Sequence, residues 1–196
     1  MNSKLDENAL KQLFLEARSH DVWLNKPVTD KVIDEIYDIL KMGPTSANAC
    51  PARFIFVKSE DAKLKLKDCL AEGNIEKSMT APVVAIVGMD MEFYEQLPKL
   101  FPHTDARSWY VGNDEKILET AFRNSTLQGA YLIMAIRSRG LDAGPMSGFD
   151  SEKLDTAFFP DARVKSNFIC AFGYGDKNKL HPRGPRLEFS EACKIV

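Results

Sequence analysis

The spacing of apolar positions predicts two helices at the start of the chain. Ser3 and Asp6 have the spacing of a capping box, and the apolar residues that follow recur at helical intervals until about Arg18. Thr29 is the expected N-cap of a second helix, again with one apolar face. This helix is expected to stop at 42–44, where Met-Gly-Pro places a glycine and then a proline after the last turn.

Short apolar runs farther along the chain predict four strands separated by helices. The strands are expected at 54–57, 83–87, 141–143 and 167–172. Further helices are expected around 62–70, 74–79, 114–139 and 151–158. A Gly-Pro-Met-Ser-Gly turn over 144–148 follows the third strand, and a tail rich in proline and basic residues begins at 175.

The helix predicted over 114–139 is the longest element and spans roughly 39 Å at 1.5 Å per residue. Its stripe of apolar and small residues consists of Leu118, Ala121, Phe122, Ser125, Gly129, Leu132, Ile133 and Ile136. The aromatic segment 90–112, broken by Pro98 and Pro102, shows no regular period. We interpret this segment as a partly helical lid rather than as core.

The order of these elements is compatible with an α+β fold or with a doubly wound α/β fold. The irregular spacing of the strands and the long helix in the middle of the chain favour α+β. No internal repeat, low-complexity tract or linker divides the 196 residues. A single domain over 1–196, with the basic tail as a C-terminal arm, is therefore expected.

Composition and charge narrow the class of protein. An apolar content of 44% and a charged content of 28% are ordinary for a globular domain. The net charge of −2 argues against nucleic acid as a partner, and apolar runs such as 83–87 are too short to cross a membrane. The first ten residues lack the features of a signal peptide, and four cysteines without a CxxC pair indicate free thiols in a reducing cytoplasm.

The chain lacks the motifs of several large enzyme classes. It contains no GxxxxGK[ST] loop, GxSxG elbow or HExxH helix. Gly173-Tyr174-Gly175 begins like a dinucleotide-binding GxGxxG motif, but Asn178 stands in place of the third glycine. The three histidines are scattered, and no cysteine has a histidine at ligand spacing, so no metal site is expected.

Three short segments combine polar groups with turns and are candidate binding elements. The loop 43–51 offers hydroxyl, amide and backbone N–H groups between two prolines, although an ordinary connector has the same composition. Asn74 and Lys77 project from one face of a helix, as residues at a solvated helix start also do. The turn 144–148 leaves the Ser147 N–H free, which by itself is only a property of a turn.

Taken in order, these segments resemble the nitroreductase family. The resemblance rests on an early arginine-containing turn, a P-[ST]-S-x-N loop before the first core strand, an N-x-x-K helix, a strand followed by a turn, and a basic C-terminal segment. Several stretches resemble its malonic semialdehyde reductase branch: GPTSAN, FPHTDARSW, ETAFRNS, GLDAGPMSGFD, SNFI and GYGDKNKL. The resemblance covers the whole chain and implies the nitroreductase fold, a central and mostly antiparallel sheet flanked by helices in an intertwined homodimer.

The resemblance implies FMN bound tightly and non-covalently at the dimer interface, with residues drawn from both chains. Arg18 and Arg186, with Arg183 as a further candidate, would hold the 5′-phosphate. Ser46 and Asn48 would reach the flavin from the second subunit. The other residues implied in cofactor binding are Ser19, His20, Pro44, Asn74, Lys77, Pro145, Met146, Ser147 and Gly148.

Two of these residues are expected to act in the chemistry. Lys77 would stabilise negative charge at flavin N1/O2, and the backbone N–H of Ser147 would point at N5, with NADPH or NADH as reductant in a ping-pong cycle. Two positions depart from the family. Many members have a basic residue where this chain has Val22, and His20 stands where a serine is common. Recognition of N1/O2 is therefore expected to depend more strongly on Lys77.

Within the malonic semialdehyde branch, the carboxylate of the substrate requires a cation. Arg107 and Arg123 are the candidates, with His103 in the same aromatic segment as Arg107, and a structural salt bridge is the alternative for either arginine. Three functions stay open. They are reduction of malonic semialdehyde to 3-hydroxypropanoate in pyrimidine degradation, broad reduction of nitro compounds or quinones, and flavin binding without turnover.

Overall fold

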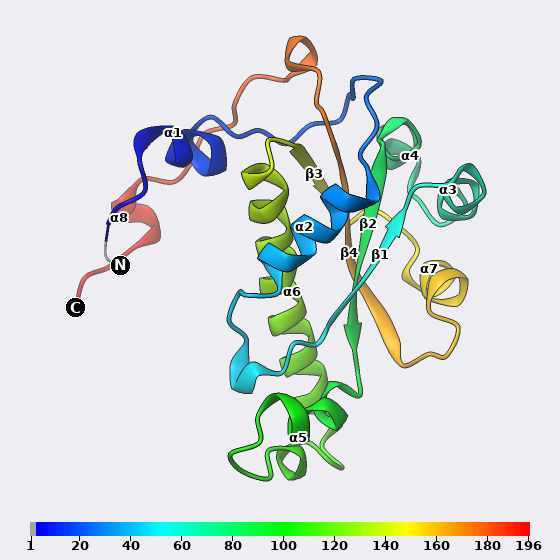
Figure 1. Ribbon diagram of the computed structural model, residues 1–196, viewed down its shortest axis with the longest axis vertical. Helices are drawn as coiled ribbons and strands as arrows, with labels where there is room; N and C mark the ends of the chain where they lie inside the picture. The colour runs from blue at the N-terminus through cyan, green and yellow to red at the C-terminus, as the bar shows by residue number, and fades with distance from the viewer. Residues whose placement is uncertain (1–2) are drawn as a thin grey trace.

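Four strands form one antiparallel sheet in a computed structural model that describes residues 3–196. The strands are β1 Ala52–Val57, β2 Val83–Asp90, β3 Asp142–Met146 and β4 Val164–Gly173. Their order across the sheet is β1-β2-β4-β3, and every neighbouring pair is antiparallel (Figure 1). The expectation of an α+β fold with a mostly antiparallel central sheet is confirmed.

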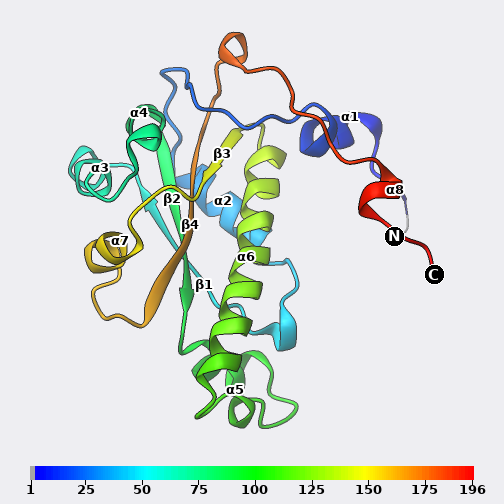
Figure 2. The same ribbon diagram turned by 180° about the vertical axis from the view of Figure 1, so that it is seen from behind.

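Helices cover both faces of this sheet. The longer helices are α2 Asp30–Leu40, α3 Glu60–Lys67, α4 Glu72–Thr80, α6 Asp114–Ser138 and α7 Ser151–Phe158. α2 and α6 pack on one face and α3 and α7 on the other, as Figures 1 and 2 show from opposite sides. The short helices are α1 Glu7–Leu10, α5 Leu97–Leu100, α8 Phe189–Ala192, the π-helix η1 Lys11–Leu15, and the 3-10 turns η2 Ser46–Asn48, η3 Phe93–Gln96, η4 Arg107–Trp109 and η5 Lys177–Lys179.

β2 is the centre of the core. All eight of its residues are buried, because successive side chains of a strand point to opposite faces and both faces are covered. Val83, Ala85 and Val87 pack with α2 and α6. Val84 and Ile86 pack with α3 and α7. Burial on both faces explains why the sequence of this strand is a continuous apolar run rather than an alternating one.

A third apolar cluster lies at the start of α6 and corrects the interpretation of 90–112 as a lid outside the core. Phe93, Leu97 and Tyr110 are buried there against Ile117. The rings of Phe93 and Tyr110 meet edge to face, with 4.9 Å between their centroids. The short turns η3 and η4 give these residues no helical period, so the sequence pattern did not reveal their burial.

The first helix differs from its prediction at both ends. Ser3 does not cap it. The carboxylate of Asp6 accepts the Ala9 N–H at 2.7 Å, which makes Asp6 itself the N-cap. The α-helix changes to a π-helix after one turn and ends at Leu15, before Arg18. Arg18 therefore lies in an extended segment that is free to pair with a strand.

Three other boundaries affect the site. Thr29 caps α2 as predicted. β3 continues to Met146, so most of the predicted turn 144–148 is strand, and the bend follows it. In the stripe predicted for α6, Leu118 and Phe122 are 47% and 53% exposed, so these two residues lie outside the core of the single chain.

Candidate functional site

The exposed edge of β3 carries a backbone donor without a partner. In an antiparallel ladder, every second residue directs its N–H and C=O at the neighbouring strand. Pro145 pairs with Cys170 but has no N–H to donate to β4, so its backbone groups are directed away from that strand. Ser147, two residues later, has the same orientation. Among the hydrogen bonds of residues 3–196, none is donated by the Ser147 N–H.

An open hollow of about 340 Å³ lies beside that edge. Pro145, Met146 and Ser147 form one wall. The opposite wall comes from α6 and β4 and consists of Thr126, Ala130, Ile133 and Phe168. The hollow is lined mainly by apolar side chains, so it suits a flat ring system, and the Ser147 N–H offers that ring one directed hydrogen bond.

α4 holds the turn that follows β3. Asn74 Nδ2 donates to the Gly148 carbonyl at 2.8 Å, and the Ala71 N–H donates to the same oxygen at 3.1 Å. A Cβ on Gly148 would lie 2.6 Å from Asn74 Nδ2, so the glycine permits this close approach. Lys77 is half-buried one turn farther along α4, where its carbonyl accepts the Trp23 indole N–H at 2.9 Å. The structure thus brings Asn74, Lys77 and the turn at Gly148 into one neighbourhood.

The segment that contains Arg18 runs beside the start of β3. Ser19 forms a parallel bridge with Ala143, and the His20 N–H donates to the Ala143 carbonyl at 3.2 Å. Gly144 makes room for this contact, because a Cβ there would lie 2.2 Å from the His20 carbonyl oxygen. The segment therefore extends the edge of the sheet and fixes Arg18 near it.

The two ends of the chain meet at Arg18. Its guanidinium donates to the His181 carbonyl, and Arg183 donates to the Ala17 carbonyl at 3.1 Å. Arg186 instead donates to the two carbonyls just before it in the chain. Of the three arginines predicted to hold a phosphate, the structure brings the segments of Arg18 and Arg183 together, whereas Arg186 is engaged within its own segment.

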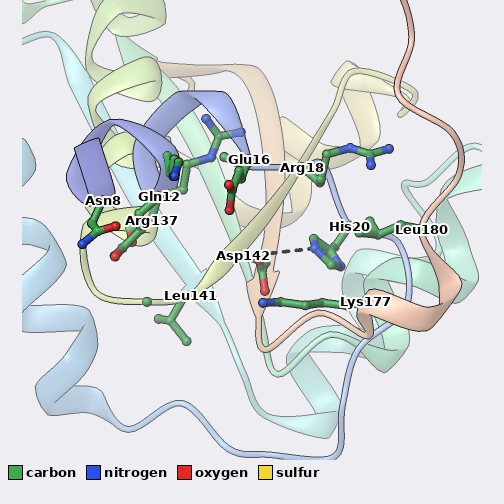
Figure 3. Close-up of a pocket in the computed structure, with 13 residues that line it drawn as sticks. Asn8, Gln12, Glu16, Arg18, His20, Arg137, Leu141, Asp142, Lys177 and Leu180 are labelled. Atoms are coloured by element: carbon green, nitrogen blue, oxygen red, sulfur yellow. Dashed lines mark hydrogen bonds and ion pairs between the residues drawn. The ribbon is translucent and has the colours of Figure 1, made fainter. Parts of the chain in front are cut away.

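A polar cavity of about 560 Å³ opens next to Arg18 (Figure 3). Its charged and titratable lining residues are Lys11, Glu16, Arg18, His20, Arg137, Asp142 and Lys177. His20 is nearly buried, and its Nε2 lies 3.4 Å from Asp142 Oδ1. Burial lowers the pKa of His20 below its ordinary value of 6.5, although the charge of Asp142 acts in the opposite direction. At neutral pH the positive charge of the cavity therefore comes from its arginines and lysines.

The predicted binding loop holds three non-glycine residues in the left-handed region. Ala47, Asn48 and Cys50 have φ angles of 49°, 50° and 42°. Such a conformation costs on the order of 1–3 kcal/mol per residue and persists only where the surrounding structure imposes it. The side chains of Ser46 and Asn48 are exposed, and Asn48 Nδ2 donates to the Leu100 carbonyl at 2.9 Å. Imposed strain of this kind favours a binding element over an ordinary connector.

Three side chains of α6 fix this loop, and none of them is among the site residues predicted from the sequence. Asn124 Oδ1 accepts the Ser46 N–H at 2.8 Å. Gln128 Oε1 accepts the first N–H of β1 at 2.8 Å, and Tyr131 Oη donates to the Pro44 carbonyl at 2.9 Å. The signal available in the sequence was their spacing of four and three residues, which places an amide, an amide and a phenol on one face of the helix.

A single chain does not bring the loop and the edge of β3 together. The loop is fixed by positions 124, 128 and 131 of α6, and the hollow is lined by positions 126, 130 and 133. Each position of the second set lies two residues after one of the first. Because each residue advances about 100° around a helix, the two sets lie on opposite sides of α6. Figure 1 likewise places the light-blue η2 turn beyond the far end of α2, away from β3.

Both arginines predicted to bind the substrate already have carboxylate partners. Arg107 forms a bidentate pair with Glu95, at 2.8 and 2.7 Å. Arg123 pairs with Glu119 one turn earlier on α6. His103 is exposed. In the single chain these residues are therefore not assembled into a carboxylate-binding site.

The four cysteines are free thiols. Burial raises the pKa of Cys170 to about 12, which leaves this thiol protonated and inert at neutral pH. Within residues 3–196, no group of His, Cys, Asp and Glu side chains could hold a metal ion. No helix of the same range combines the length and the apolar character that crossing a membrane requires.

Comparisons with known proteins give one consistent result. The sequence profile described as "Nitroreductase family" matches residues 16–174. A protein of Polynucleobacter asymbioticus named "Putative NADH dehydrogenase/NAD(P)H nitroreductase" is 59% identical over 196 residues, 100% of both chains. A Burkholderia lata protein of the same kind of name is 59% identical over 191 residues, 97% of this chain and 98% of the relative. A nitroreductase structure from Exiguobacterium sibiricum, solved in complex with FMN, has a TM-score of 0.83 at 19% identity and covers 100% of this chain and 99% of that chain. At that identity the likeness shows the fold alone.

Proposed function

Because the chain belongs to the nitroreductase family, we propose that it is an FMN-dependent oxidoreductase that takes its electrons from NADPH or NADH. The observation that carries this proposal is the unpartnered Ser147 N–H at the edge of β3, beside the apolar hollow. The names of the relatives, which refer to NAD(P)H-dependent reduction, support the same function.

The residues present fit both ends of FMN. The hollow beside Pro145 and Met146 is open and apolar, as a flat ring requires. Arg18 and Arg183, which lie on adjoining segments, would hold the phosphate, with Arg186 as a third ligand from the same arm. A charge-assisted contact of this type contributes about 1.5–3 kcal/mol, so two or three would give tight binding without a covalent bond.

When bound, FMN supplies hydride transfer between NAD(P)H and an oxidant. The chain would orient the ring and balance its charge. The Ser147 N–H would donate a hydrogen bond to N5, and Pro145, which lacks an N–H, leaves that donor without a close competitor on the strand edge. Asn74 keeps the turn at Gly148 in place. The Lys77 ammonium would stabilise negative charge at the N1/O2 edge. Two further proposed contacts, Ser19 and His20, adjoin Arg18.

We further propose a homodimer with the cofactor at the interface. Pro44, Ser46 and Asn48 are fixed on the side of α6 opposite to the hollow, so a second copy would deliver them to the site. In a dimer with two-fold symmetry the interface is isologous, so each dimer would contain two such sites.

Exposed apolar surface supports the dimer. Leu118 and Phe122 are half exposed on α6, and Leu187 and Phe189 are more than half exposed on the C-terminal arm. Figure 1 shows this arm, in red, leaving the body of the molecule beside α1. Burying such residues against a second copy would remove apolar surface from water.

The free thiols fit a reducing compartment, and we propose that the protein is cytoplasmic.

For the oxidant we propose a broad range of nitro compounds and quinones. The hollow is open, so a flat aromatic compound would stack on the outer face of a flavin ring bound there. A narrower second candidate is reduction of malonic semialdehyde to 3-hydroxypropanoate in pyrimidine degradation, which the branch-like stretches such as FPHTDARSW favour. It requires Arg107 or Arg123 to exchange its glutamate partner for the carboxylate of the substrate.

Reconstitution with FMN tests the proposal. We expect a yellow protein that quenches FMN fluorescence, loses its colour with NADPH or NADH in an anaerobic stopped-flow experiment, and regains it with an oxidant. A nitrofuran, a benzoquinone and malonic semialdehyde, compared as oxidants, rank the substrates. A colourless protein that cannot be reconstituted contradicts FMN binding. A flavin that is bound but never turns over favours the alternative of flavin binding without catalysis.

Variants of the two arginines test the narrower substrate. If malonic semialdehyde is reduced through a carboxylate pair, Arg107→Ala or Arg123→Ala should raise its KM about 10- to 100-fold, the equivalent of one charge-assisted contact. KM for the neutral nitrofuran should not change. Glu95→Gln is the matched control, because it releases Arg107 from its partner and should not raise KM. Unchanged KM values in both alanine variants would eliminate this role for the arginines.

A further inference from the structure

α6 carries a polar face that the proposed chemistry leaves without a role. Asn124, Gln128 and Tyr131 follow one another along one side of the helix, and each forms a hydrogen bond with a backbone group of segment 44–52. We propose that these three are positioning residues, which hold the loop in the conformation that lets its exposed side chains contact FMN bound to a second copy of the chain. The inference rests on the proposed function and extends it to residues that touch neither cofactor nor substrate.

The loop needs external support, because its own backbone does not favour this conformation. Ala47 and Cys50 adopt φ angles of 49° and 42°, in a region that residues other than glycine and asparagine rarely occupy. Bonds within the loop are local. Thr45 Oγ1 accepts the Cys50 N–H at 3.1 Å, and the Ala49 N–H donates to the Ser46 carbonyl at 2.9 Å. These bonds close a tight turn but do not determine where that turn lies on the protein.

The support comes from buried amides. Asn124 and Gln128 are 2% and 5% exposed. Asn124 is engaged at both ends, since Oδ1 accepts the Ser46 N–H and Nδ2 donates to the Thr120 carbonyl at 2.9 Å. The amide therefore cannot turn without losing one bond, and a buried polar group that loses its partner is costly. This arrangement ties the position of the Ser46 backbone to that of the helix.

Tyr131 ties the start of the loop to the same helix. Its hydroxyl donates to the Pro44 carbonyl, and its ring covers Gly43, where a Cβ would lie 2.1 Å from the ring. The opposite side of α6 lines the hollow through Ala130 and Ile133. One rigid helix thus sets the positions of two elements of the proposed dimer. The first is the loop that reaches the second copy, and the second is the hollow that receives the loop of that copy.

Three variants each remove one of these bonds by different chemistry. Asn124→Leu keeps the approximate volume but removes the acceptor for the Ser46 N–H. Tyr131→Phe removes a single hydroxyl, so it retains the fold even if the first variant does not. Gln128→Glu keeps an acceptor for β1 and Gln128→Met removes it, which separates the hydrogen bond from the shape of the side chain. Val164→Ala, at the far end of β4, is the control for a general loss of stability.

The first readout is hydrogen–deuterium exchange of the flavin-free protein. We expect the amides of segment 45–52 to exchange at least about tenfold faster in Asn124→Leu, Tyr131→Phe and Gln128→Met. In Gln128→Glu and Val164→Ala they should exchange as in the wild type, after the global stability of each variant is taken into account. Unchanged exchange in the first three variants would overturn the proposal.

The second readout is the dissociation constant of FMN from a fluorescence titration. This constant should rise about tenfold or more in the variants with a loosened loop and stay within about threefold of the wild type in Gln128→Glu and Val164→Ala. The two groups of variants would then differ by more than about 0.6 kcal/mol in the free energy of FMN binding. A loosened loop with unchanged FMN affinity would also overturn the proposal, because the α6 residues would then be structural only. Failure of the proposed function itself would be visible first in the wild type, as absence of FMN binding.

Discussion

Gly144→Ala tests whether the segment of Arg18 is locked against β3. The added Cβ would lie 2.2 Å from the His20 carbonyl oxygen and 3.6 Å from the ring of Trp23. The shorter contact is with a backbone atom, so rotation of a side chain cannot relieve it. The segment and the strand must instead move apart, which breaks the hydrogen bond from the His20 N–H to the Ala143 carbonyl.

The size of the effect follows from this geometry. Overpacking of a well-filled site costs about 1–3 kcal/mol, and loss of the backbone hydrogen bond costs about 0.5–1.5 kcal/mol. Alanine also restricts the unfolded chain, which offsets about 0.4–1 kcal/mol. These ranges combine to a loss of about 0.5–4 kcal/mol. We expect a value near the middle, a fall in the free energy of unfolding of about 2–3 kcal/mol, which lowers Tm by about 4–12 °C in a chain of this length. Since Arg18 lies on the displaced segment, the affinity for FMN should fall as well.

Urea unfolding followed by tryptophan fluorescence measures this change, because Trp23 lies beside Gly144. All samples need the same protein concentration, since the stability of the proposed dimer would depend on it. Gly73→Ala is the matched control. Apart from its chain neighbours and the backbone of its own helix, no atom of the described residues lies within 4 Å of its added Cβ, and alanine in a helix such as α4 should stabilise by about 0.5–1 kcal/mol. A Gly144→Ala midpoint equal to that of the wild type would refute the argument from close packing.

Two further predictions concern other parts of the molecule. Gly129→Ala would place a Cβ 2.3 Å from the ring of Phe168, which lines the hollow, so a thermal melt should show a loss of about 1–3 kcal/mol and a titration a weaker affinity for FMN. Asp90→Asn should lower the free energy of unfolding by about 1–3 kcal/mol, because the buried carboxylate accepts hydrogen bonds from Arg53 and Arg163. Burial raises the pKa of Asp90, but hydrogen bonds from Arg163 and the charge of Arg53 bring the pKa below its ordinary value of 3.8. The difference between wild type and variant should therefore be constant from about pH 5 to 8 and shrink as the pH falls below 3.8; urea titrations that show the same difference at low pH would contradict it.

The elements with local signals could be predicted from the sequence. Thr29 caps α2, and α7 spans Ser151–Phe158 as expected, because a cap and an apolar period depend only on neighbours along the chain. The apolar run 83–87 marks β2 for the same reason. Local signals of this kind did not predict the burial of the aromatic segment 90–112. Its buried residues sit on short turns, and only the tertiary structure shows that they share a cluster with α6.

The geometry of the candidate site could not be predicted, because it depends on distant contacts. Asn124 and the Ser46 N–H that it accepts are 78 residues apart, and Arg18 and the His181 carbonyl are 163 apart. The positive φ of Ala47 has no signal in the residue type, since alanine is not typical of that region. Resemblance to a family identified candidate residues of the site, and the structure supplied the hydrogen bonds that hold them.

The place of β2 in the sheet has a consequence for synthesis of the chain. β2 pairs with β4 along its whole length, and Asp90 and Gly173 are 83 positions apart in the sequence. At about 5–20 residues per second, about 4–17 s pass on the ribosome before β4 is complete. During that interval the apolar run 83–87 presents an open strand edge to other nascent chains, a known route to aggregation. The most protected strand of the folded protein is therefore its most vulnerable one while it is being made.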